Sequence, residues 1–234
     1  MNTLQLITDI RYATRKLLLA LLVLNIAFIG LTAVRGYPTW WLRFMGETNM
    51  WTRGTALELL ASSAVCAAVF WLRRYQESRG LSTAPMVYLW LAAASAFAYL
   101  ALDELLMIHE RLEGIYGVND SYAILTYIVG AIALCFLLSA DLRKSQGAIR
   151  LFAAAIGLMV ISTFIDRFTS TRGPLMAFEE ILELLAAYLF LASFILVLAR
   201  TVTQILTSIH TSFGSADDSS AAESSAQFTC QTRK

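Results

Sequence analysis

Six long apolar stretches, separated by short charged or turn-forming segments, dominate the pattern of hydrophobic and polar residues along the chain. About 20 consecutive apolar residues in a helix cross the hydrocarbon core of a bilayer, and these stretches reach or approach that length. The pattern therefore predicts an all-α, polytopic membrane protein built as a six-transmembrane-helix bundle. The predicted spans are Lys16–Val34, Thr55–Leu72, Met86–Ile108, Tyr122–Ala140, Ile149–Ile165 and Met176–Ala199.

The composition supports the same class of protein. Hydrophobic residues make up 58% and charged residues 15% of the 234 residues, whereas soluble proteins carry about 25% charged residues. The net charge of +1 gives no indication of a nucleic-acid partner, so the lipid bilayer is the expected partner. Cys66, Cys135 and Cys230 are too scattered for a disulfide framework or a cysteine metal site.

The chain divides into three predicted parts. Residues 1–15 form a cytoplasmic N-terminus, residues 16–202 the six-helix transmembrane domain, and residues 203–234 a cytoplasmic tail. We expect the tail to be disordered from about residue 212, because it is rich in Ser and Ala and poor in large apolar residues. The first apolar stretch is expected to remain as an anchor, since no clear small-residue cleavage site follows it.

Lysine and arginine are distributed unevenly between the two sides of the predicted bundle. With the N-terminus inside, twelve of the 18 lysines and arginines fall on the inner side. Cytoplasmic segments of membrane proteins carry an excess of these residues, so both termini are predicted to be cytoplasmic. The inner set is Arg11, Arg15, Lys16, Arg73, Arg74, Arg79, Arg143, Lys144, Arg150, Arg200, Arg233 and Lys234; the outer set is Arg35, Arg43, Arg53, Arg111, Arg167 and Arg172.

The end of the third apolar stretch has the sequence LALDELLMIHERLE, which is unusually rich in charged residues. It contains Asp103, Glu104, His109 and Glu110, at the predicted outer end of the helix. At about 100° per residue, Asp103 and Glu110 lie on one helix face, which His109 extends, and Glu104 lies on another.

Other helices bring further acids to the same outer level. The sixth helix begins with Glu179, Glu180 and Glu183, of which the first and last are four residues apart and share a face. Glu58 lies in the first turn of the second helix, and Asp166 lies at the end of the fifth. The inner half of the bundle has no comparable set of acids.

This arrangement predicts a cation site. Carboxylates on facing helices repel one another unless a cation or shared protons lie between them, and carboxylates with a histidine bind iron or manganese in helical bundles. We expect one or two divalent metal ions of undetermined identity, which in an enzyme would polarise a lipid-level substrate or activate water. No P-loop or haem-attachment motif occurs, so neither nucleotide nor haem is expected. The predicted ligands are Asp103, His109, Glu110, Glu179 and Glu183, with Glu58, Glu104, Asp166 and Glu180 as further contributors.

Two other functions are consistent with the same acids. In a structural or assembly subunit, they would form interhelical salt bridges with Arg111, Arg167 and Arg172. In a proton- or ion-coupled transporter, they would mark a path through the membrane. Such a path also needs polar residues in the inner half, where Asn25 and Ser95 are the main candidates.

The motif D-[DE]-x4-H-E, formed here by Asp103, Glu104, His109 and Glu110, resembles that of uncharacterised bacterial six-helix integral membrane proteins. These also carry an acidic pair at the start of the sixth helix, which would be Glu179–Glu180. The resemblance covers the six-helix region and implies the inner (plasma) membrane of a bacterium, but no particular activity. A more distant likeness is to the alkaline ceramidase and progestin-receptor hydrolase superfamily, which binds zinc through several histidines, whereas this chain has His109 alone in that region.

Overall fold

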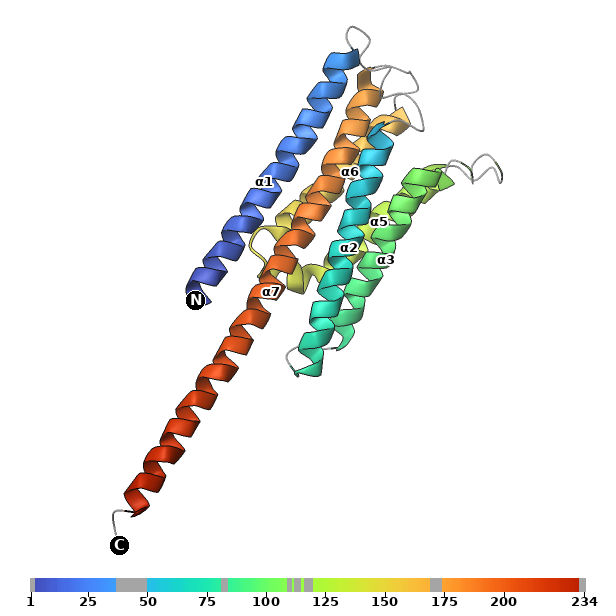
Figure 1. Ribbon diagram of the computed structural model, residues 1–234. Helices are drawn as coiled ribbons and strands as arrows, with labels where there is room; N and C mark the ends of the chain where they lie inside the picture. The colour runs from blue at the N-terminus through green and yellow to red at the C-terminus, as the bar shows by residue number, and fades with distance from the viewer. Residues whose placement is uncertain are drawn as a thin grey trace.

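The computed structural model describes residues 3–36, 50–80, 84–108, 111, 115, 120–168 and 174–231. All regular secondary structure in these residues is helical (Figure 1). The helices are α1 (Thr3–Gly36), α2 (Met50–Ser78), α3 (Ala84–Leu106), α5 (Asp120–Lys144), α6 (Ala148–Phe168) and α7 (Pro174–Gln231).

All six of these helices are long and apolar enough to cross a membrane. The prediction of an all-α protein with six candidate spans is therefore confirmed, and six such helices indicate an integral membrane protein. The candidate spans within the described residues are Leu4–Val34, Thr52–Ser78, Met86–Leu106, Leu125–Lys144, Ala148–Ile165 and Ala177–His210.

Two helices extend well beyond their predicted spans. α1 begins at Thr3 rather than Lys16, so most of the expected N-terminal segment is helical. α7 continues to Gln231, although the composition of the tail predicts disorder from about residue 212. The chain has no proline after Pro174, so no residue in this stretch must interrupt the backbone hydrogen bonds of the helix, and alanine favours helix.

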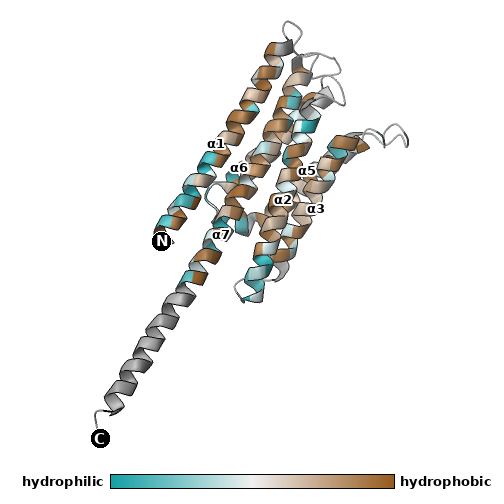
Figure 2. Ribbon diagram, viewed as in Figure 1, coloured by the Kyte–Doolittle hydropathy of each residue, from teal (hydrophilic) through white to brown (hydrophobic). Residues whose placement is uncertain are grey.

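Successive helices run in alternating directions, so the N-terminus of α1 and the turns that join α2 to α3 and α5 to α6 lie at one end of the bundle (Figure 1). α7 also leaves the bundle at this end, which we call the terminal end. Figure 2 shows apolar residues along the helices and hydrophilic residues where α2 and α3 meet the terminal end. The opposite end, called the acidic end, is formed by the helix ends Gly36, Met50, Leu106, Asp120, Phe168 and Pro174.

α7 is the central helix, because it packs against α1, α2, α5 and α6. In the core, aromatic rings from three helices meet edge to face, with centroid separations between 4.9 and 5.9 Å. Each such pair contributes about 0.5–1.5 kcal/mol beyond the area that it buries. The rings, which we call the aromatic core, belong to Trp90 and Phe97 of α3, Phe152 of α6, and Phe190 and Phe194 of α7.

α1 lies at the edge of the bundle and packs on α7. Large apolar side chains such as Leu19, Leu24 and Leu31 are exposed along it, which suits a helix that faces lipid. Polar contacts tie α1 to its neighbours: the Tyr188 hydroxyl of α7 donates a hydrogen bond to the Leu18 carbonyl at 3.0 Å. A second contact, made by Asn25, belongs to the candidate site.

Candidate functional site

Two of the predicted metal ligands accept hydrogen bonds from uncharged donors on different helices. Asp103 is buried, and Tyr127 of α5 donates its hydroxyl to this carboxylate. The Tyr127 hydroxyl also lies 3.4 Å from that of Tyr99. Glu183 of α7 accepts a hydrogen bond from the buried Ser162 hydroxyl of α6 at 3.0 Å. The two acids therefore have different neighbours in the bundle.

Within the described part of the chain, no group of three or more His, Cys, Asp or Glu side chains could hold a metal ion. His109 and Glu110 lie outside the described residues, and so do the side chains of Asp166 and Arg167. The five-ligand set therefore stays a prediction. Arg111 is exposed and forms no ion pair with any acid that the structure describes. The remaining acids of the predicted set, Glu104, Glu179 and Glu180, are half-buried.

Glu58 lies inside the bundle, although it was predicted only as a further contributor to the metal site. Its Oε1 atom accepts a hydrogen bond from the Asn25 amide of α1 at 2.6 Å. Asn25 is itself buried and also donates to the Leu21 carbonyl at 3.1 Å. Tyr188 of α7 lies within electrostatic range of the Glu58 carboxyl group. Glu58 therefore lies where α1, α2 and α7 meet.

Three oxygen atoms on this face of α2 are buried without a hydrogen-bond partner: Thr55 Oγ1, Glu58 Oε2 and Ser62 Oγ. The three residues occur at positions i, i+3 and i+7, which share one helix face. A buried polar atom without a partner costs about 1–3 kcal/mol, and such atoms mark places for an ordered water or a ligand. We call Asn25, Thr55, Glu58, Ser62 and Tyr188 the Glu58 site.

The Glu58 site lies below the acidic end of the bundle, within the candidate spans. At about 1.5 Å per residue, Glu58 is about 9 Å along α2 from Thr52, and Tyr188 is about 16 Å along α7 from Ala177. No ion pair joins Glu58 to a lysine, arginine or histidine among the described residues. Among the side chains that the structure describes, the site thus holds an acid within the candidate spans without a cation paired to it.

A second polar group lies at the terminal end and contains a buried ion pair. Arg73 of α2 and Asp141 of α5 are 3.3 Å apart, with side chains 9% and 1% exposed. The Trp90 indole donates to Asp141 at 3.1 Å, and Arg73 donates to the Gln76 amide oxygen at 2.9 Å. Lys144 adds a longer contact to Asp141 at 3.5 Å. We call these five residues the charged cluster.

The charged cluster was not predicted from the sequence, and Glu58 was predicted only as a further contributor to a metal site. Arg73 and Lys144 were used only to predict the orientation of the bundle in the membrane, and Asp141 was not among the predicted site residues. The terminal end of the bundle carries this mixed-charge group, which was not predicted. A usable signal for the Glu58 site was present, since Asn25 interrupts the first apolar stretch while Thr55, Glu58 and Ser62 line one face of the second.

Comparison with known proteins places the chain in a family. A family model described as a domain of unknown function, DUF8692, matches residues 10–198, which is most of the chain and includes the Glu58 site and the charged cluster. Neither the curated proteins nor the solved structures gave a match. The chain therefore belongs to the DUF8692 family.

Proposed function

We propose that this multi-pass membrane protein is a proton-coupled transporter in which Glu58 takes up and releases the proton. The observation that carries the proposal is the Glu58 carboxyl group, held by Asn25 through one oxygen while the other is buried without a partner. Ionisable residues within membrane spans are rare, and they mark proton and ion pathways more often than other groups do.

The cost of burying charge supports a proton as the bound species. An ionised acid in the middle of a membrane helix costs about 2.5–3.5 kcal/mol on insertion scales. No cationic side chain among the described residues offsets that cost at Glu58. A bound proton removes the charge, and the unpaired hydroxyls of Thr55 and Ser62 offer further polar atoms for a water that delivers it.

A coupled transporter also needs a barrier between the two sides of the membrane. Along the buried face of α2, Ser62 is followed by Cys66 and Val69, both fully buried and apolar, before Arg73 is reached. The aromatic core fills the space beside them. This layer separates the Glu58 site from the charged cluster along α2, while α7 carries the buried polar residue Ser193 between Tyr188 and Arg200.

Proton flux into vesicles tests the proposal. The purified protein is reconstituted, a potassium diffusion potential is imposed, and a pH-sensitive dye reports the lumen. We expect flux with the wild type and with Glu77→Gln, because Glu77 forms a surface ion pair with Arg74 at the terminal end. We expect none with Glu58→Gln, which retains an oxygen for Asn25 but cannot exchange a proton. Equal flux in the Glu58→Gln variant and the wild type contradicts the proposal.

A structural or assembly subunit is the second candidate, and the Arg73–Asp141 pair favours it. This buried pair joins α2 to α5. On this alternative the polar groups fix helix packing alone. It predicts that neither the wild type nor any Glu58 variant carries protons.

The ligands of the predicted divalent-cation site would be His109 and Glu110 together with Asp103, Glu179 and Glu183. It would serve a metal-dependent membrane enzyme acting at the lipid level. Metal analysis of the purified protein, with and without the double substitution His109→Ala and Glu110→Ala, tests this hypothesis. Equal and negligible metal in both proteins removes it.

We also propose that both termini face the cytoplasm and that the protein resides in the inner membrane of a bacterium. The excess of lysine and arginine on the predicted inner side supports this orientation. The alternating directions of the helices in Figure 1 agree with two termini on one side of the membrane.

A further inference from the structure

Positively charged side chains outnumber acids around the charged cluster. Asp141 is the acid of the charged cluster, and Arg73 and Lys144 both contact it. Arg200 of α7 lies within electrostatic range of Arg73. Two cations therefore contact one carboxylate and a third lies near Arg73, in a place where Arg73 and Asp141 are almost wholly inaccessible to solvent.

Several donors in this region have no partner. Arg200 is half-buried, and its side chain forms no hydrogen bond or ion pair with any described residue. The Nε atoms of Arg73 and Arg200 and the Ser145 hydroxyl are buried without a hydrogen-bond partner. Guanidinium N–H groups match the oxygens of phosphates and carboxylates in geometry and charge. The missing partner is therefore an anion with several oxygen acceptors.

The depth of these cations corresponds to the headgroup region of a bilayer. At about 1.5 Å per residue, Arg73 lies about 32 Å from Thr52 along α2, and Arg200 lies about 35 Å from Ala177 along α7. The hydrocarbon core is about 30 Å thick. When the other ends of both helices lie at one surface of the membrane, the two guanidinium groups reach the phosphates of the opposite leaflet.

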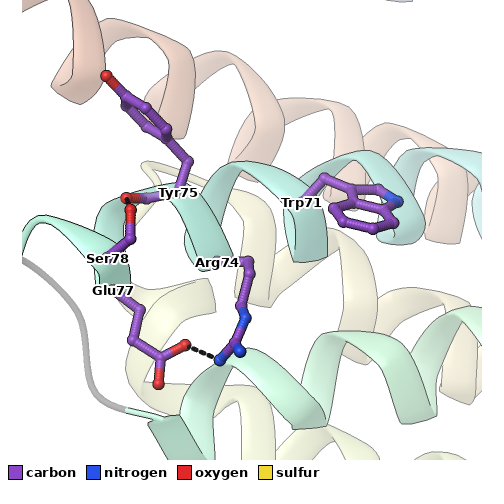
Figure 3. Close-up of a pocket in the computed structure, with 5 residues that line it drawn as sticks. All are labelled: Trp71, Arg74, Tyr75, Glu77 and Ser78. Carbon is purple, nitrogen blue, oxygen red and sulfur yellow. Dashed lines mark hydrogen bonds and ion pairs between the residues drawn. The ribbon is translucent and has the colours of Figure 1, made fainter.

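The neighbouring surface of α2 has the character of a membrane interface. A hollow of about 510 Å³ is lined by Trp71, Arg74, Tyr75, Glu77 and Ser78, and Figure 3 shows Arg74 turned toward Glu77 beside it. Trp71 and Tyr75 are exposed, as expected of aromatic side chains at headgroup level. This surface offers contacts for the glycerol and upper acyl region of a lipid.

We infer that the terminal end binds the headgroup of an anionic phospholipid between α2, α5 and α7, with its phosphate near Arg200, Lys144 and Ser145. Arg73 remains paired with Asp141, and its positive charge adds to the electrostatic attraction of the site for the phosphate. Basic pockets between transmembrane helices on the cytoplasmic side are suited to such headgroups, and the proposed orientation places the terminal end on that side. The inference does not depend on proton transport by Glu58.

Lipid binding by the full-length protein in detergent tests the inference. Native mass spectrometry measures the bound fraction of phosphatidylglycerol and of phosphatidylcholine, each added alone. We expect the wild type to prefer phosphatidylglycerol, and Arg200→Gln or Lys144→Gln each to lower its affinity about fivefold, from the contribution of one cation near a charged surface. Arg143→Gln is the matched control, since it removes the same charge from an exposed neighbour of Lys144.

Three results would overturn the inference. One is equal affinity of the wild type for the two lipids, and another is an equal loss of affinity in Arg143→Gln and Arg200→Gln. In a third arm, inorganic phosphate replaces the lipid in a thermal-unfolding assay. Stabilisation by phosphate as large as that by phosphatidylglycerol would assign the site to a soluble anion. The Lys144→Gln variant should fold normally, because this side chain is 55% exposed and its removal disturbs little packing. A loss of lipid binding in this variant therefore cannot be attributed to misfolding.

Discussion

At the scale of single residues, Asp141 and Glu58 show two ways in which the bundle holds a carboxyl group. Asp141 is surrounded by donors, since Arg73, Trp90 and Lys144 all reach it. Glu58 has a neutral amide donor on one oxygen and none on the other. The Asp141 carboxyl group is therefore held by several donors, whereas one oxygen of Glu58 has no protein donor, as the proposed exchange of a proton at Glu58 requires.

The hydrogen bond between Asn25 and Glu58 should stabilise the bundle. Replacing Asn25 by Ala leaves both carboxyl oxygens of Glu58 without a donor, and we expect the free energy of unfolding to fall by about 1–3 kcal/mol. Thermal unfolding in detergent measures the change. Thr8→Ala on the same helix is the control, because Thr8 is exposed and bonds its own helix at the Leu4 carbonyl. Equal stability of Asn25→Ala and Thr8→Ala would show that the contact contributes nothing.

The Arg73–Asp141 pair should behave as a buried ion pair. Asp141→Leu leaves Arg73 charged and without its carboxylate, and we expect a loss of about 3–5 kcal/mol in the free energy of unfolding. Adding Arg73→Leu to the same chain should restore much of that loss, because it removes the isolated charge. Thermal unfolding of the single and double variants measures this coupling. A double variant as unstable as the sum of the two single ones would contradict it.

At the scale of helices, the contact between α1, α2 and α7 determines whether the Glu58 site exists. α1 reaches α2 through the Asn25 side chain, and Phe28 of α1 and Leu184 of α7 both lie close to Gly54 of α2. A Cβ atom at Gly54 would lie 3.5 Å from Leu184 Cδ1 and 3.6 Å from Phe28 Cε1. The missing side chain therefore lets three helices meet above the site.

Substitution at Gly54 tests this close approach. Gly54→Ala places its methyl group at ordinary van der Waals distances, and it gains up to about 1 kcal/mol in helix propensity. Gly54→Leu has no room for its further carbons and should lower the free energy of unfolding by about 1–3 kcal/mol. Thermal unfolding of the two variants gives the comparison. If the leucine variant were as stable as the alanine variant, the three helices would not be closely packed at this point.

The number and type of helices could be predicted from the sequence, whereas the contacts between them could not. The backbone of a membrane span must satisfy its hydrogen bonds internally in lipid. An apolar stretch of bilayer length such as Met86–Ile108 is therefore predicted to form a helix. The pairing of Arg73 with Asp141 depends on α2 lying near α5, and residue spacing within one chain carries no such information. For the same reason the sequence could not show that Asn25 of α1 lies against Glu58 of α2.

At the scale of the whole molecule, two polar regions lie at opposite ends of the bundle with an apolar layer between them. The Glu58 site lies toward the acidic end, and the charged cluster lies at the terminal end. Trp90 belongs to both the aromatic core and the charged cluster, because its ring packs on Phe194 and its indole nitrogen donates to Asp141. A change in the packing of the layer would therefore also alter the charged cluster.

The orientation of the whole bundle gives a prediction of its own. Reporter domains that are active only in the cytoplasm, fused in turn to the N-terminus and to the C-terminus, should both be active. The same reporter fused after Gly36, at the acidic end of α1, should be inactive. Activity of the Gly36 fusion together with inactive terminal fusions would reverse the proposed orientation.

The most direct test of the central claim is the reaction of Glu58 with a hydrophobic carbodiimide, which modifies protonated carboxyl groups in apolar surroundings. Peptide mass spectrometry of treated membrane vesicles locates the adduct. We predict modification at Glu58, at a rate that falls as the pH is raised, with Glu77 unmodified because it is paired with Arg74 at the surface. An unmodified Glu58 at every pH, in protein that binds the reagent elsewhere, would contradict the claim that this carboxyl group exchanges a proton within the membrane.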